Sequence, residues 1–124
     1  MNRPDCVFCQ IVTGERDGLV FYRDPLVTAF QDARRAAPVH ILVVPNRHIA
    51  SLNEAGPEDE ALLGHLLLVA QRLAREQGIA ERGYRLVMNT GPDGGQSVFH
   101  LHVHLLGGRF MGVSRPAVEE HGGR

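Results

Sequence analysis

Apolar and polar residues alternate in short blocks along most of the chain, and one longer block has helical spacing. Apolar runs bounded by Gly, Pro, Asn or Asp predict five short strands, at residues 19–22, 27–30, 40–44, 84–89 and 98–106. The tripeptide Arg23-Asp24-Pro25 separates the first two runs and is typical of a hairpin turn. The third run is rich in β-branched residues, as expected of an inner strand. Loops are expected at 32–38 and, rich in glycine, at 90–96.

The one long helix is expected between Pro57 and Gln77. Pro57 suits a first helical position, acidic residues 58–60 complement the positive N-terminal end, and Gly78 suits the C-cap. A broad apolar stripe should cover a sheet; its members are Leu62, Leu63, Leu66, Leu67, Val69, Ala70 and Leu73. The order β-β-β-α-β-β indicates an α+β domain with a mostly antiparallel sheet.

Length, composition and charge limit the class of protein. With 124 residues, 44% of them hydrophobic and 22% charged, the chain has the composition of a single globular domain, which we assign to residues 1–124. Thirteen basic and fourteen acidic residues argue against a strongly basic nucleic-acid surface. No apolar run approaches the ~18 residues of a membrane-spanning helix, and no signal-peptide core follows Met1–Asp5. We therefore expect a cytoplasmic protein that binds neither membranes nor nucleic acid.

Three histidines, His100, His102 and His104, alternate with apolar residues in the fifth predicted strand. Side chains of a strand alternate between its faces, so the three imidazoles should share one face, and Phe99, Leu101, Val103 and Leu105 the other. A solvated face that happens to carry histidine is the plain alternative. As chemistry, the pattern suits ligands of a catalytic metal or an imidazole that attacks phosphorus.

The flanking residues favour the imidazole nucleophile. A two-metal phosphohydrolase usually needs bridging carboxylates, yet the first acidic residue after His104 is Glu119. Upstream lies a glycine-rich stretch, 91–96, followed by Ser97. Glycines let backbone N–H groups approach an anion closely, and the serine adds a hydroxyl donor. The sequence therefore predicts a phosphate cradle beside a nucleophile, with no catalytic metal.

The segment 95–109, GQSVFHLHVHLLGGR, resembles the motif of the histidine triad (HIT) family. Its Gly-Gly-Arg end is similar to the Hint branch, the purine nucleoside phosphoramidases. Further similarity lies at residues 6–12, 29–32, 38–40 and 45–49, so the resemblance covers a core from about 6 to 111. It implies a five-stranded antiparallel sheet with one main helix, which dimerises into a ten-stranded sheet. The branch commonly ends in a Trp-containing segment; residues 112–124 differ from it, and we expect them to form a flexible tail.

The resemblance also implies roles for particular residues. His102 would attack the α-phosphorus of an adenosine or other purine nucleoside phosphoramidate (AMP or GMP type) and form a covalent nucleotidyl intermediate. His104 and His40 would hold phosphate oxygens. Asp32 would accept ribose hydroxyls. Asn89, Gly95 and Ser97 would contact the phosphate, with Ser97 also near the leaving group, and Gln96 would belong to the nucleotide-binding residues as well. Alternative functions are hydrolysis of dinucleoside polyphosphates and a nucleotide-binding regulatory module.

Cys6 and Cys9 form a C-x-x-C pair. A closed zinc site needs four ligands, and no second C-x-x-C exists, so His48 and His100 are the candidates for the remaining two. Such a Cys-Cys-His-His set resembles the structural zinc site of many bacterial HIT proteins. A redox pair and two packed, unligated thiols are the alternatives. Of the other histidines, His65 is expected to be structural.

Overall fold

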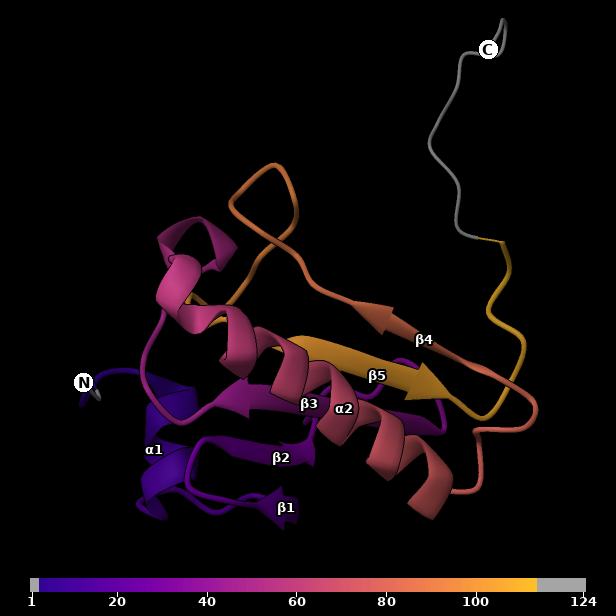
Figure 1. Ribbon diagram of the computed structural model, residues 1–124. Coiled ribbons are helices and arrows are strands. Elements are labelled where there is room, and N and C mark those ends of the chain that lie inside the picture. Colours follow the sequence, from indigo (N-terminus) through magenta and orange to yellow (C-terminus); the bar gives the residue numbers. More distant parts are fainter. Residues whose placement is uncertain (1–2, 114–124) are drawn as a thin grey trace, which may run out of the picture.

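The computed structural model describes residues 3–113, which form one antiparallel sheet and two α-helices (Figure 1). The sheet has the order β1-β2-β3-β5-β4. Its strands are β1 (Val20–Arg23), β2 (Val27–Gln31), β3 (Val39–Pro45), β4 (Tyr84–Val87) and β5 (Val103–Gly107). The helices are α1 (Val7–Thr13) and α2 (Glu60–Glu76). The predicted α+β class, with five antiparallel strands and one main helix, is confirmed.

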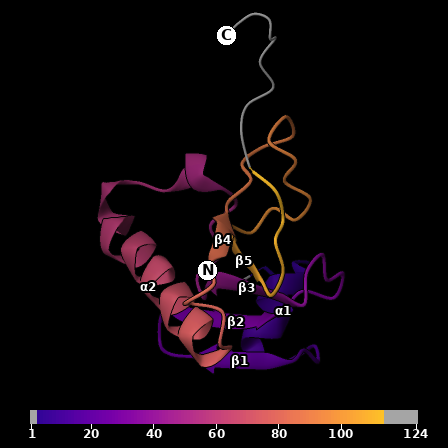
Figure 2. The ribbon, with the colours of Figure 1, turned by 90° about the vertical axis from the view of Figure 1, so that its right-hand side faces the viewer.

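The two helices cover opposite faces of the sheet (Figure 2). In β3, Ile41 and Val43 belong to the core under α2, whereas Leu42 and Val44 pack with Phe8 of α1. Because side chains alternate along a strand, the uniformly apolar run at 40–44 is buried on both faces. His40 lies on the same face as Leu42, which places it on the α1 side of the sheet.

Helix α2 follows a short 3₁₀ turn at Pro57–Asp59 and ends in a glycine-dependent motif. Gly78 has a φ of 74°, and the N–H of Ile79 donates to the carbonyl of Ala74 while that of Gly78 donates to Arg75. This is the Schellman arrangement, which requires a left-handed residue after the helix. Most of the predicted stripe is buried, but the prediction for Leu67 is wrong, because its side chain is 49% exposed.

The fifth strand is shorter than predicted, because only residues 103–107 pair with a neighbouring strand. Residues 98–102 follow the 45–50 segment instead: the N–H of Leu101 donates to Ile49, and the His100 ring reaches the carbonyl of Pro45. The prediction that Phe99 shares a strand face with Leu101, Val103 and Leu105 is therefore wrong, because Phe99 lies outside the strand and is 47% exposed whereas the other three are buried. The fourth strand likewise ends at Val87 rather than at 89.

Helix α1 was not predicted from the sequence pattern. Cys6 is its N-cap, since the Cys6 sulfur accepts the N–H of Cys9, and Gly14 ends it with a φ of 87°. Phe8 and Ile11 anchor the helix to the sheet. A helix of seven residues is too short to show clear periodicity, so only its cysteines stood out in the sequence.

The β1–β2 hairpin is tied to α2 by the carboxylate of Asp24. One oxygen accepts the N–H groups of Leu26 and Val27, and the other lies 2.6 Å from both Tyr22 Oη and His65 Nε2. His65 therefore has a structural position, as expected. Burial alone would raise the pKa of Asp24, but these hydrogen bonds lower it to about 2.

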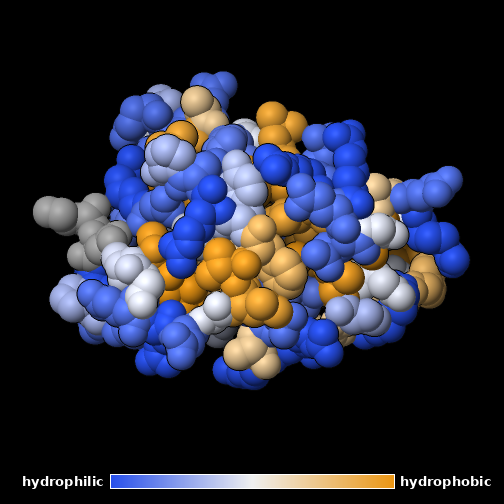
Figure 3. Space-filling model, turned by 90° about the horizontal axis from the view of Figure 1, so that it is seen from below, coloured by the Kyte–Doolittle hydropathy of each residue, from blue (hydrophilic) through white to orange (hydrophobic). Residues whose placement is uncertain are grey.

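The two edges of the sheet differ. Seen from the β1 side, hydrophobic side chains gather in the middle of the surface (Figure 3). The β1–β2 pairing contains an irregularity between Val20 and Tyr22, whereas β4 pairs regularly with β5.

Neither helix of residues 3–113 is long and apolar enough to cross a membrane. Most of the predicted flexible tail, residues 114–124 including His121, lies outside the described residues.

Candidate active site and metal site

The four predicted metal ligands lie together between α1 and the segment that precedes β5. Nδ1 of His100 is 3.4 Å from Sγ of Cys6 and 3.5 Å from Sγ of Cys9, and Nδ1 of His48 is 3.4 Å from Sγ of Cys9. One donor atom from each residue lies within 4.8 Å of all the others. Ligand atoms about 2.0–2.3 Å from a tetrahedral Zn²⁺ would be separated by similar distances.

The chemistry of this cluster also fits a metal. Nε2 of His100 donates to the carbonyl of Pro45 at 2.8 Å, which leaves the lone pair on Nδ1, the atom that faces the two sulfurs. Burial lowers the pKa of His100 to about 4, so the ring is neutral as a ligand must be. Burial raises the pKa of the Cys9 thiol, and a bound cation would reverse that effect.

His102 has its proton and its lone pair assigned by the backbone. Its Nδ1 lies 2.7 Å from the carbonyl oxygen of His100, and a carbonyl can only accept, so Nδ1 donates and Nε2 carries the lone pair. Burial lowers the pKa of His102, which keeps the ring neutral. The Phe8 ring packs edge-on against it, with 5.1 Å between centroids. Nε2 is thus an unprotonated nitrogen on a firmly held ring.

His40 and His104 are hydrogen-bonded to each other beside His102, and the Asp32 carboxylate lies close to both. The N–H of Ala36 donates to Nδ1 of His40 at 3.0 Å, so the neutral His40 ring carries its proton on Nε2. That Nε2–H faces Nδ1 of His104 at 2.9 Å and Oδ2 of Asp32 at 3.1 Å. Burial lowers the pKa of His40, and lowers that of His104 to about 4. As an acceptor at Nδ1, His104 carries its own proton on Nε2.

Asp32, His40 and His104 are also close enough to hold a metal ion by distance alone. Their hydrogen bonds do not suit one. A metal would need the lone pair of His40 Nε2, which would move the ring proton to Nδ1 and point it at the N–H of Ala36. This cluster is better suited to donating protons than to binding a cation.

The glycine-rich loop is held in shape by two residues of the predicted nucleotide site. Nδ2 of Asn89 donates to the carbonyl of Gly94 at 2.8 Å. The Gln96 amide accepts the N–H of Gly91 and donates to two carbonyls, those of Ala50 and Val98. Gln96 is therefore fully engaged with the backbone.

The remaining predicted phosphate contacts lie at the end of this loop. Gly95 has a φ of 80°, a conformation that favours glycine, and Ser97 is exposed. The hydroxyl of Ser97 makes no hydrogen bond within residues 3–113. The side-chain hydrogen bonds of that range do not connect the loop to His40, His102 or His104.

Three contacts of the site were missed by sequence reasoning. The Phe8 ring supports His102, the N–H of Ala36 sets His40, and the carbonyl of Pro45 sets His100. Phe8 stands between the two cysteines, where an aromatic residue gives a weak signal. Backbone groups act whatever their side chain is, so the other two contacts leave no trace in the sequence.

A five-stranded antiparallel sheet with three alternating histidines beside a fourth from β3 defines the histidine triad class of nucleotide-processing domains. Residues 13–111 match the family described as HIT domain. The chain belongs to this family, and it is a HIT-family hydrolase.

Particular relatives cover nearly the whole chain. The purine nucleoside phosphoramidase of Escherichia coli is 47% identical over 108 residues, which are 87% of this chain and 91% of that protein. A histidine triad protein from Clostridium difficile has a TM-score of 0.90 and 40% identity, covering 93% of this chain and all of that one. A HIT family hydrolase from Legionella pneumophila has a TM-score of 0.85 and 45% identity, covering 87% and 96%.

Proposed function

We propose that this protein is a purine nucleoside phosphoramidase that acts through a covalent intermediate on His102. The lone pair on Nε2 attacks the α-phosphorus of a nucleoside 5′-phosphoramidate and forms an N–P bond. The P–N bond to the amine breaks, and the amine leaves with a proton supplied by the site. Water then attacks the same phosphorus and gives a proton back to the site, while the N–P bond breaks; this releases the nucleoside monophosphate and returns the electron pair to Nε2.

The surrounding residues have distinct proposed roles. The Nε2–H group of His104 donates to a phosphate oxygen, where negative charge increases in the transition state, and His40 supports it by donating its own Nε2–H to Nδ1 of His104. Ser97 lies beside the leaving amine, and the backbone of Gly95 approaches the phosphate. Asp32 accepts the ribose hydroxyls. Asn89 and Gln96 are assigned to the nucleotide site as well, with side chains that hold the phosphate-binding loop.

One observation carries the proposal most directly: the hydrogen bond from Nδ1 of His102 to the carbonyl of His100. It fixes the tautomer in which Nε2 is the nucleophile, so no proton has to be removed before attack. The similarity to the E. coli purine nucleoside phosphoramidase supports the same chemistry.

The test is hydrolysis of adenosine 5′-phosphoramidate in the presence of EDTA by the wild type, His102→Ala and His65→Gln. We expect metal-independent turnover that falls about 10⁴-fold or more in His102→Ala. His65→Gln, a histidine substitution on α2, should retain activity. Wild-type protein that binds AMP without turnover would instead favour polyphosphate substrates or a nucleotide-binding module. Loss of activity in EDTA that Mg²⁺ restores would indicate a catalytic metal.

We further propose that Cys6, Cys9, His48 and His100 hold a structural Zn²⁺ that takes no part in phosphoryl chemistry. When bound, the metal would join α1 to the segment before β5. Two thiolate ligands must stay reduced, which supports a cytoplasmic location.

A homodimer formed through β4 completes the proposal. Strand β4 is an edge strand with regular pairing, so its outer N–H and C=O groups can pair with a second copy. Helix α2 packs on β3 and β5, which leaves Leu86 of β4 and Leu67 of α2 exposed. A second β4 would extend the sheet to ten strands and cover these side chains.

A further inference from the structure

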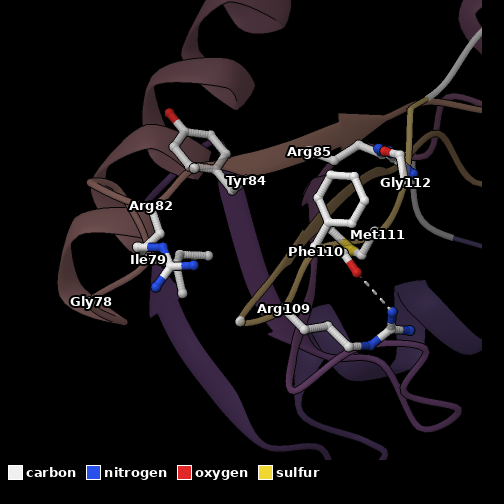
Figure 4. A pocket seen from close by; sticks show the side chains of 11 residues that line it. Gly78, Ile79, Arg82, Tyr84, Arg85, Arg109, Phe110, Met111 and Gly112 are labelled. Carbon is white, nitrogen blue, oxygen red and sulfur yellow. Dashed lines mark hydrogen bonds between the residues drawn. The ribbon is translucent and has the colours of Figure 1, made fainter.

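Arg109 connects the end of β5 to the loop that precedes His40. Its Nη2 donates to the carbonyl of Ala36 at 2.8 Å, and Nη1 donates to the carbonyl of Phe110 at 3.3 Å. The residue borders an open cavity of about 480 Å³ between residues 78–85 and 108–112. Figure 4 shows its guanidinium turned away from Arg82 and Tyr84, which lie on the other side of that cavity. Arg109 therefore acts on the loop rather than on the cavity.

Two glycines bring Arg109 to this position. A Cβ on Gly107 would lie 2.5 Å from the side chain of Ile79, and a Cβ on Gly108 would lie 2.8 Å from that of Pro38. Gly108 also has a φ of 99°, which disfavours other residues. The chain can thus turn sharply after β5 and pass close to Pro38, at the end of the 32–38 loop.

The orientation of Ala36 matters because its N–H determines which nitrogen of His40 is protonated. Residues 33–36 are exposed and lie outside the sheet, so strand pairing holds neither the 35–36 peptide, which carries this N–H, nor the adjoining 36–37 peptide, whose carbonyl Arg109 contacts. Oδ2 of Asp32 also lies 3.1 Å from Nε2 of His40, where its negative charge favours a proton on that nitrogen. Under the proposed function, Asp32 binds the ribose when substrate is present, and the N–H of Ala36 then becomes the main group that keeps the proton on Nε2.

We propose that Arg109 is a positioning residue for the phosphate-binding histidines, acting through Ala36 on His40 and through His40 on His104. The expected effect of Arg109 on catalysis rests on the proposed function. The expected effect of Arg109 on the tautomers of the histidine rings does not. Hydrogen bonds thus link Arg109 to Ala36, Ala36 to His40 and His40 to His104. The first and last of these residues belong to the same segment, because His104 lies within β5 and Arg109 just beyond its end.

The test compares Arg109→Ala, Arg109→Lys and Arg82→Ala. Arg82 lines the same cavity and makes no side-chain hydrogen bond within residues 3–113, so it is the matched control. In Arg109→Ala we expect kcat for a nucleoside phosphoramidate to fall about 5- to 10-fold, with KM within about 2-fold of the wild type. Lysine can donate to Ala36, but its single nitrogen does not reproduce the two-nitrogen geometry with which the guanidinium contacts Ala36 and Phe110, so Arg109→Lys should recover part of the loss.

Nitrogen-15 NMR of the histidine rings, recorded with AMP bound, separates positioning from general damage. Protonated and unprotonated ring nitrogens resonate far apart, so the method reports the tautomer directly. We expect His40 protonated on Nε2 in the wild type and in Arg82→Ala, and a mixture of tautomers in Arg109→Ala. Ala36→Pro removes the N–H donor, so it should give the same mixture, and adding Arg109→Ala to it should change nothing further.

Unchanged His40 and His104 tautomers in Arg109→Ala would overturn the inference, as would equal losses in Arg82→Ala. A wild-type protein without phosphoramidase activity would refute the proposed function alone. The NMR comparison would still decide whether Arg109 sets the histidine rings.

Discussion

Backbone groups determine which ring nitrogen carries the proton in three histidines, and one of these three determines it in a fourth. The carbonyl of Pro45 accepts a hydrogen bond from Nε2–H of His100, so Nδ1 has the lone pair that can bind a metal. The carbonyl of His100 accepts a hydrogen bond from Nδ1–H of His102, so Nε2 has the lone pair that can attack phosphorus. A backbone N–H occupies Nδ1 of His40, so Nε2 of that ring donates to Nδ1 of His104. The division of labour among these residues therefore depends on peptide orientation, which only the folded chain defines.

At the same scale, the Asp24 carboxylate should make stability depend on pH. Its pKa is lowered from 3.8 to about 2 in the folded protein, so its contribution is fully present above about pH 4. The contribution is lost as the pH falls from about 4 to about 2, because folding then requires giving up a proton that the unfolded chain binds. Asp24→Asn should lower the free energy of unfolding by about 1–3 kcal/mol at pH 7.

Urea unfolding followed by circular dichroism at pH 7, 4 and 3 checks this expectation. The difference between wild type and Asp24→Asn should shrink as the pH decreases. Glu76→Gln is the control: this carboxylate pairs with Arg72 at the surface, where solvent screens the pair, so its removal should change the free energy of unfolding little at any of the three pH values. A difference for Asp24→Asn that is the same at all three pH values would contradict the assignment.

At the scale of elements, hydrophobic periodicity was sufficient for the sheet and for α2, but not for α1 or the start of β5. Five strands and their antiparallel class follow from local alternation and from turn residues such as Asp24. Residues 98–102 also alternate, yet they leave the sheet because His100 and Leu101 find partners in the 45–50 segment. Contacts so distant in sequence have no local signal.

In the candidate site, too, the sequence predicted which side chains take part but not the backbone contacts that orient them. Residue types and spacing were enough to single out both the histidines and the cysteines. They could not show that Gln96 is fully occupied in bracing its loop, or that Ala36 sets a ring proton. These contacts depend on backbone atoms that every residue carries.

The shortness of α1 leads to a prediction about metal removal. A seven-residue helix is unstable alone, so we expect α1 to depend on its packing through Phe8 and on metal binding by the proposed ligands Cys6 and Cys9. Purified protein should contain about one Zn²⁺ per chain. Prolonged chelation, or Cys9→Ser, should lower Tm by several degrees and increase hydrogen exchange in residues 6–14 well before that of β3.

Elemental analysis and hydrogen exchange monitored by mass spectrometry measure both effects. Thr13→Ser, at the end of α1 and away from the sulfurs, is a suitable control and should keep the metal and the protection. Metal content well below one per chain in protein purified without chelator would refute the zinc assignment. So would unchanged protection of α1 after the metal has been removed.

At the scale of the whole molecule, the two sheet edges should behave differently. The irregular β1–β2 pairing twists and interrupts one edge, which is a common protection against strand addition. The β4 edge is regular, and Leu86 on it is 36% exposed. Phe110, 83% exposed, lies near Arg85 on the same side of the molecule (Figure 4). An open edge flanked by exposed apolar side chains is what a second copy of the chain would cover.

Leu86→Arg should therefore convert a dimer into a monomer, because burying an unpaired charge at the centre of the joined sheets costs several kcal/mol. Leu19→Arg, at the β1 edge and 58% exposed, is the matched control and should remain dimeric. Light scattering during size-exclusion chromatography gives the mass of each variant directly. A monomeric wild type would refute dimerisation, while a dimer broken only by Leu19→Arg would place the interface at β1, where the hydrophobic patch of Figure 3 lies.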